Sequence, residues 1–170
     1  RLNMPWRLTE AVSGDIYVAD WGNDRIVKFD SKGEYVRDFG KPGNGEGEFI
    51  KPAGVAVDTF GRIYVCDWGN ERLQVLDAEG KFLQLSLGES GISPWAQNFL
   101  NVNVEEGEAR AKSDLAKPDI EYFDPEDRNE ISAHIEKYFW SPMSVTIGSD
   151  NNLYVTESNR HRIQVFSINP

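Results

Sequence analysis

The chain has 170 residues, with 28 Asp and Glu against 18 Lys and Arg, and its net charge is −10. This length predicts one domain with enough chain to bury a hydrophobic core. The acidic excess argues against nucleic acid as a partner, because phosphate binding requires clustered Lys and Arg. No apolar run approaches the roughly 18 residues that a membrane-spanning helix needs. The composition therefore predicts a globular chain with no nucleic-acid partner and no membrane span.

An internal repeat dominates the sequence. Residues 16–25 (IYVADWGNDR) and 63–72 (IYVCDWGNER) are close copies, and residues 153–162 (LYVTESNRHR) form a looser third copy. The spacing extends upstream, where a proline lies twelve residues before the tyrosine of each copy, at Pro5, Pro52 and Pro142. A repeat period in the forties with this much internal agreement is typical of a propeller or a solenoid.

Each copy lies within a unit of short strands. In the second unit, the segments 54–58, 62–67, 73–76 and 81–87 are apolar or alternating and are separated by turns rich in Gly, Asn and Asp. Four antiparallel strands in about 45 residues make one propeller blade. The pattern Pro-x-Gly-Val-Ala-Val-Asp, then Ile-Tyr-Val-x-Asp-x-x-Asn-x-Arg and Asp-x-x-Gly, resembles the NHL repeat. We therefore predict an all-β, NHL-type β-propeller arc of four-stranded antiparallel blades, half of a six-bladed propeller.

The repeat spacing divides the chain into three parts. Residues 1–88 are predicted to form the first two blades, and residues 140–170 an incomplete third blade. Residues 89–139 are an insertion between the second and third blades. An open arc exposes strand edges. We therefore expect the remaining blades to come from a longer chain or from a second copy.

The insertion differs from the blades in charge and in periodicity. It carries 12 acidic and 5 basic residues, a net charge of −7. The run Asp-Pro-Glu-Asp at 124–127 is typical of a helix start. Apolar residues then follow at helical spacing, at Ile131, Ile135, Tyr138 and Phe139. These features predict an amphipathic helix over 125–138, and a segment 94–117 that is partly helical or irregular.

Strand connectivity predicts which loops lie together. Alternate turns of an up-and-down blade lie at opposite ends of its strands, so the turns between second and third strands share one face with the links between blades. That face would carry Trp21, Trp68, Arg160 and His161 beside the insertion. Aromatic residues and Arg dominate binding hot spots, so these four are the candidate partner-binding residues. The alternative is that they pack against neighbouring turns.

The polar residues of the repeated turn have a different interpretation. A catalytic residue should occur once, whereas these residues recur, which favours a structural role in the turn and between blades. The repeated structural residues are Asp20, Asn23 and Arg25 in the first copy, Asp67, Asn70 and Arg72 in the second, and Arg162 in the third.

Catalytic and metal signals are sparse. A zinc site needs three or four Cys, His or carboxylate ligands, and the chain offers only Cys66, His134 and His161 as sulfur or imidazole ligands. Cys66 occupies a strand position that holds small residues in the other copies, which predicts a small buried side chain. No Ser–His–acid set can be assembled with two histidines. We therefore predict no catalytic residue, no metal ligand and no cofactor, and leave open a divalent cation in the channel of a complete propeller.

Two functional classes follow from the resemblance. NHL-type domains commonly act as scaffolds, which implies a non-catalytic propeller that binds a protein, peptide or glycan on the face bearing the insertion. The resemblance also extends to metal-dependent propeller enzymes, the peptidyl-hydroxyglycine amidating lyase and the gluconolactonase-like hydrolases. The alternative is thus a lyase or lactonase-like hydrolase with its site in the central channel. We favour the scaffold with a protein or peptide partner. The resemblance slightly favours an extracytoplasmic location.

Overall fold

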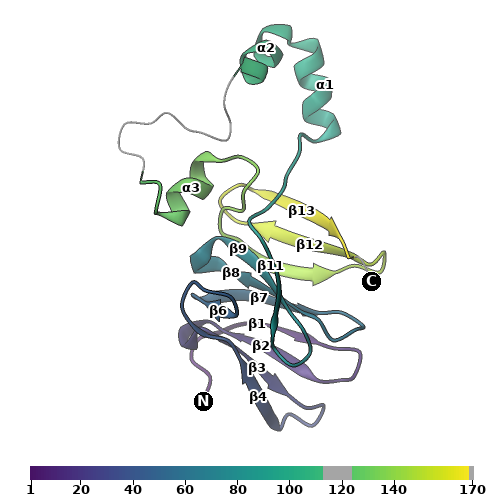
Figure 1. Ribbon diagram of the computed structural model, residues 1–170. Coiled ribbons are helices and arrows are strands. Elements are labelled where there is room, and N and C mark those ends of the chain that lie inside the picture. Colours follow the sequence, from purple (N-terminus) through teal and green to yellow (C-terminus); the bar gives the residue numbers. More distant parts are fainter. Residues whose placement is uncertain (113–123, 169–170) are drawn as a thin grey trace.

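The computed structural model describes residues 1–112 and 124–168, whose larger sheets stand side by side as three propeller blades (Figure 1). In each blade the strands are antiparallel and follow one another in chain order. The first two blades have four strands, and the third has three within the described residues. The predicted all-β propeller arc is confirmed, and within the described residues the arc is open.

The strands follow the repeat. Blade 1 consists of β1 (Pro5–Glu10), β2 (Ile16–Asp20), β3 (Arg25–Phe29) and β4 (Tyr35–Phe39). Blade 2 consists of β7 (Pro52–Val57), β8 (Ile63–Asp67), β9 (Arg72–Leu76) and β10 (Phe82–Ser86). Blade 3 consists of β11 (Pro142–Ile147), β12 (Asn152–Glu157) and β13 (Arg162–Ser167). The link between the first two blades contains a short parallel pair, β5 (Lys41–Pro42) and β6 (Glu48–Phe49).

The hydrophobic core lies between the blades. One buried cluster joins blades 1 and 2 around Phe49, and a second joins blades 2 and 3 around Phe139. The inner strands β1, β7 and β11 are packed next to one another. At Gly54 of β7 an added Cβ would lie 3.0 Å from the backbone of Ser144 and Val145, so this contact leaves no room for a side chain. The core is therefore built from contacts between neighbouring sheets.

The insertion is helical in its described parts. It contains α1 (Pro94–Val102), α2 (Val104–Lys112) and α3 (Arg128–His134), and α1 and α2 project away from the blades (Figure 1). The predicted partly helical segment 94–117 thus holds two helices up to residue 112, and its remaining residues lie outside the described part. Within the described ranges, no helix is long and apolar enough to cross a membrane.

The predicted helix over 125–138 is wrong in its bounds. The N-cap is Asp127, whose Oδ1 accepts the N–H groups of Asn129 and Glu130, and not Asp124. The helix ends at His134, because Ile135 turns to an extended conformation. Phe139 then enters the core between blades 2 and 3 with no exposed surface. Tertiary packing therefore takes the last apolar residues of the expected helical stripe away from the helix.

Candidate functional site

The turns between second and third strands lie at the end of the blades where α3 sits. In blade 1 the turn is a short 3-10 helix, η1 (Trp21–Asn23), and in blade 2 it is η2 (Trp68–Asn70), which contacts α3. In blade 3 the turn is Ser158–His161. We call this end, made by η1, η2, residues 158–161 and α3, the insertion face.

A buried carboxylate stands beneath each of these turns. Asp20, Asp67 and Glu157 are all buried, and each accepts a hydrogen bond from the Nε atom of the repeated arginine of its blade, at 2.9, 2.7 and 2.6 Å. Burial raises the pKa of the Asp67 carboxyl, while hydrogen bonds from Ile50, Asn70 and Arg72 oppose that rise. Each carboxylate also accepts the backbone N–H of a residue just before the first strand of its blade: Asn3 at 2.7 Å, Ile50 at 2.8 Å and Trp140 at 2.8 Å. The carboxylate thus ties the turn to the start of its own blade.

The repeated arginines hold the links between blades. Arg72 is almost fully buried, and its guanidinium donates to the carbonyl oxygens of Asn44, Gly45 and Glu48 in the link before blade 2. Carbonyl oxygens of this link thus face a cation inside the protein. Recurrence of these residues in the sequence is accounted for by this shared geometry.

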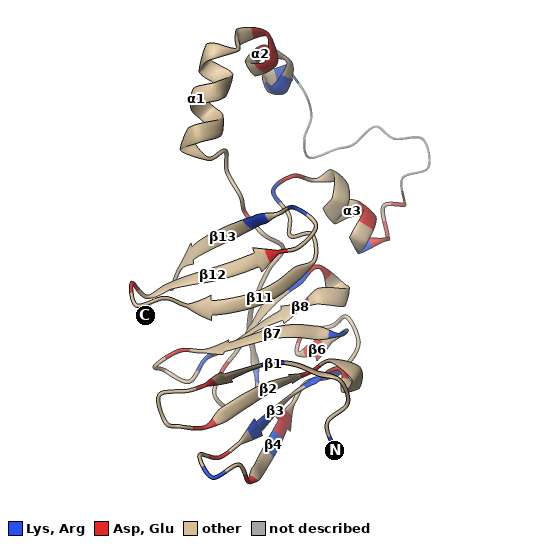
Figure 2. Cartoon of the chain, turned by 180° about the vertical axis from the view of Figure 1, so that it is seen from behind, with Lys and Arg blue, Asp and Glu red and all other residues tan. Residues whose placement is uncertain are grey.

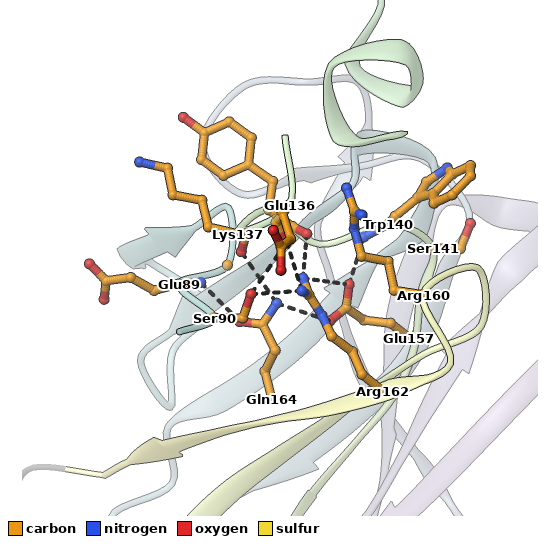
Figure 3. A network of polar contacts seen from close by, with 12 residues as sticks. Glu89, Ser90, Glu136, Lys137, Trp140, Ser141, Glu157, Arg160, Arg162 and Gln164 are labelled. Carbon is orange, nitrogen blue, oxygen red and sulfur yellow. Dashed lines mark hydrogen bonds and ion pairs between the residues drawn. The ribbon is translucent and has the colours of Figure 1, made fainter. Parts of the chain in front are cut away.

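In blade 3 the same arginine fastens the base of the insertion. Arg162 donates to Ser90 Oγ and to the carbonyl oxygen of Glu136, each at 2.7 Å, so it joins the outgoing and returning chain (Figure 3). Its Nη2 donates to the carbonyl oxygen of Tyr138 at 2.7 Å. Gln164 accepts the N–H of Glu89 at 2.9 Å. The insertion therefore leaves and re-enters the fold at one point, the position taken by the short link in blade 2.

Arg160 also binds the insertion, at the C-terminal end of α3. Its Nη2 donates to the carbonyl oxygens of Ser132, of Ala133 at 3.2 Å and of Ile135 at 3.0 Å, at the C-terminal end of α3. Its guanidinium also lies over the Trp140 ring, 5.6 Å from the centroid. Burial, with the nearby Arg162 charge, lowers the pKa of Arg160. The sequence predicts that Arg160 anchors a partner. In the structure its hydrogen bonds go to α3 within its own chain.

Glu71 is a site residue that the sequence reasoning did not select. It is buried at the end of η2, where it accepts hydrogen bonds from the backbone N–H of Ser141 and, at 2.7 Å, from Asn129 Nδ2 of α3. Burial raises the pKa of Glu71 to about 7, and the neighbouring carboxylates of Glu157 and Asp127 add to the rise. A signal was present in the sequence, because an acid follows the repeated Asn in both close copies.

Tryptophan side chains form a row across blades 1 and 2. The Trp6 and Trp21 rings stack with centroids 5.1 Å apart, and the Trp21 and Trp68 rings lie 4.9 Å apart. Trp21 and Trp68 are half-buried, whereas Trp6 is 51% exposed. Lys51 Nζ lies 5.9 Å from the centre of the Trp68 ring. The structure brings the two predicted tryptophans into contact and adds Trp6, which lies outside the repeated motif.

The two histidines and Cys66 do not form a common site. His161 is exposed in a left-handed backbone conformation (φ 50°), and His134 is exposed at the end of α3. Cys66 is fully buried, as the sequence predicts, and burial raises the pKa of its thiol. Among the described residues, no three His, Cys, Asp or Glu side chains are grouped so that they could hold a metal ion.

Comparisons with known proteins agree with this architecture. A family model described as a 6-bladed beta-propeller matches residues 7–91, half of the chain, and an NHL repeat model matches residues 139–166. No curated protein sequence matches the chain.

Solved structures resemble the chain only at low identity. A protein of unknown function from Bacteroides thetaiotaomicron is 16% identical, with a TM-score of 0.53 over 90% of this chain and 32% of that one. A streptogramin B lyase is 17% identical, with a TM-score of 0.47 over 95% of this chain and 39% of that one. A virginiamycin B lyase from Staphylococcus aureus is 15% identical, with a TM-score of 0.48 over 96% of this chain and 41% of that one.

The chain therefore spans well under half the length of these three solved structures. The family models and the arrangement of the strands agree on the architecture. The chain belongs to the 6-bladed beta-propeller family, and its third blade matches the NHL repeat.

Proposed function

We propose that the chain is a non-catalytic propeller scaffold that binds a protein or peptide on the insertion face. The tryptophan row of Trp6, Trp21 and Trp68 is the observation that carries the proposal. Aromatic side chains provide a large contact area at a small entropic cost, and they are enriched among binding hot spots. The row crosses from one blade to the next, so a bound segment would span the junction between blades.

The arrangement of the rings favours a peptide over a glycan. A sugar ring stacks on an open aromatic face, whereas the half-buried Trp21 ring has the Trp6 ring and the Trp68 ring as close neighbours. The exposed surface of Trp6, with what remains accessible of Trp21 and Trp68, would form an apolar strip against which the side chains of a peptide pack. Lys51, next to Trp68, adds a positive charge at one end of the strip. These features support an extended or helical peptide whose apolar side chains lie along the row.

The helical insertion provides the second wall of the proposed site. Glu71 and Arg160 hold α3 against the turns of blades 2 and 3 through contacts to Asn129 and to the end of the helix. Arg160 thus acts in this proposal by positioning α3. The exposed His161 stays a candidate for direct polar contact.

Peptides selected from a phage-displayed random library on the immobilised chain would test the proposal. Affinities of the selected peptides would be measured by fluorescence anisotropy for the wild type, Trp21→Ala and Trp68→Ala. We expect each substitution to weaken binding by at least about tenfold, as hot-spot tryptophans do. Phe60→Ala is the control, because Phe60 is aromatic and exposed but lies in the turn at the opposite end of blade 2. Unchanged affinity in both tryptophan variants, with the fold intact, would reject the proposed site.

A further inference from the structure

Helix α1 carries an apolar face that nothing in the described chain covers. Trp95, Phe99 and Val102 are 78%, 49% and 81% exposed. Their spacing of four and three residues places them on the same side of the helix. The Trp95 and Phe99 rings stack with centroids 6.3 Å apart. Single exposed apolar residues are common on surfaces, whereas a contiguous aromatic face marks an interaction site.

The other side of α1 packs against α2. Ala96 and Leu100 are half-buried. At Gly107 of α2 an added Cβ would lie 2.9 Å from the Leu100 carbonyl oxygen, so the two helices approach closely. This packing turns Trp95 and Phe99 away from α2. The exposed face is therefore a fixed feature of the α1–α2 hairpin.

The hairpin is connected to the base of the insertion. Arg110 of α2 forms an ion pair with Glu136 at 2.6 Å, and Glu136 lies where the chain returns to blade 3. A cavity of about 760 Å³ lies between the inner side of the hairpin and this base, lined among others by Leu100 and Val104. Trp95 and Phe99 do not line that cavity. The aromatic face thus lies outside that cavity, on a hairpin that the Arg110–Glu136 ion pair joins to the base of the insertion.

Charge indicates what kind of partner fits. Helix α1 has no charged residue, while acids cluster in the first half of α2 (Figure 2), where they are exposed. These acids are Glu105, Glu106 and Glu108. The insertion as a whole has 12 acids and 5 bases. Glu105 and Glu106 follow Val102 by only three and four residues. A surface that covers the apolar face would therefore meet negative charge at the Val102 end, and positive charge on the partner would complement it.

We propose that α1 is a docking helix, whose Trp95, Phe99 and Val102 face binds an apolar groove rimmed by Lys and Arg on a partner protein. Helix-in-groove recognition uses anchors at this spacing. A second copy of the chain fits less well, because it would bring the same acids, on a chain of net charge −10, against each other. This surface is separate from the tryptophan row, so the inference stands independently of the function proposed above.

A pair of model peptides tests the inference. One is an amphipathic helical Leu/Lys peptide, fluorescein-labelled, with an apolar stripe flanked by Lys. The other keeps every Leu and replaces every Lys by Glu. By anisotropy, we expect the Leu/Lys peptide to bind the wild-type chain at least about tenfold more tightly than the Leu/Glu peptide, because acidic residues follow the Val102 end of the apolar face. Its affinity should fall by at least about tenfold in the double variant Trp95→Ala, Phe99→Ala.

Further variants separate the possible outcomes. A double variant Glu105→Lys, Glu106→Lys should weaken Leu/Lys binding while leaving the apolar face in place, and Phe60→Ala should leave it unchanged. Equal affinity for the two peptides, or full affinity without Trp95 and Phe99, would overturn the inference. Loss of Leu/Lys binding only in Trp21→Ala and Trp68→Ala would do the same and would leave the proposed function standing. Self-association in sedimentation velocity that disappears in the Trp95→Ala, Phe99→Ala variant would assign the face to a second copy instead.

Discussion

The Glu71 carboxylate accepts the backbone N–H of Ser141, which lies 70 residues later in the chain. The same contact occurs one blade earlier, where Asp24 Oδ1 accepts the N–H of Lys51 at 2.7 Å. Each donor immediately precedes the proline that starts the next blade, and both donors have positive φ, 52° at Lys51 and 58° at Ser141. An acid at the end of each turn thus fixes where the following blade begins. In blade 2 this contact also holds α3 through Asn129.

Replacing Glu71 by Gln should change how stability depends on pH. Burial raises the pKa of Glu71 from 4.5 to about 7, so the folded protein holds this proton more tightly than the unfolded chain. The contribution of Glu71 to the free energy of unfolding is therefore highest below about pH 4.5 and falls as the pH rises towards about 7. Glu71→Gln cannot titrate and lacks this fall. We expect the stability of the variant to rise relative to that of the wild type, by up to about 3 kcal/mol, between about pH 5 and about pH 8.

Urea unfolding across that pH range measures the difference. Asp24→Asn is the matched control, because Asp24 makes the equivalent contact in blade 1 but is only half-buried. A Glu71→Gln difference that stays constant with pH would show that this carboxyl does not titrate in the range.

Arg160→Ala should loosen α3 without unfolding the blades. The substitution leaves the carbonyl oxygens of Ser132, Ala133 and Ile135 without this donor, and such hydrogen bonds each contribute about 0.5–1.5 kcal/mol. Hydrogen exchange of the α3 amides should therefore accelerate by about tenfold or more, while exchange in β7 and β8 stays the same. Arg160→Lys should restore part of the protection. Uniform acceleration in all three blades would contradict this local role.

The repeated arginines should differ in their effect on stability. Arg72 is 2% exposed and Arg25 is 26% exposed, although each pairs with the buried acid of its blade. Removing one partner of a buried ion pair costs about 3–5 kcal/mol, because the other charge is left uncompensated. We expect Arg72→Met to lose about that much in denaturant unfolding, and Arg25→Met to lose less, because Arg25 is partly exposed and water can reach the Asp20 carboxylate once the guanidinium is removed. Equal losses would show that burial does not set the difference.

Gly54→Ala should push blades 2 and 3 apart. The new Cβ would lie 3.0 Å from backbone atoms of Ser144 and Val145, and backbone has no rotamer with which to move aside. Overpacking of this kind costs about 1–3 kcal/mol in the free energy of unfolding. Gly91→Ala is the control, because no atom lies within 4 Å of its added Cβ. Thermal unfolding of both variants measures the effect, and a Gly54→Ala protein as stable as Gly91→Ala would mean that the sheets separate at no cost.

Much of the architecture was determined by the sequence itself. The repeat of strands and turns, with a proline before each first strand, predicted three antiparallel blades, because period-2 patterns and turn residues act locally. The same repeat predicted that Cys66 is a small buried residue, because every copy places a strand there. The paired residues Asp67 and Arg72 were correctly placed in one turn because their separation is short.

The contacts that define the insertion face were decided by tertiary structure. Helix α3 ends at His134 rather than at residue 138, because Phe139 is needed in the core and Arg160 caps the carbonyls of the helix from another blade. The roles of Glu71 and Trp6 also arise from neighbours that are distant in sequence. Local patterns fix which strand or turn a residue belongs to. Side-chain burial and hydrogen-bond partners depend on which segments the packing of the blades brings together, and no spacing within the sequence records that.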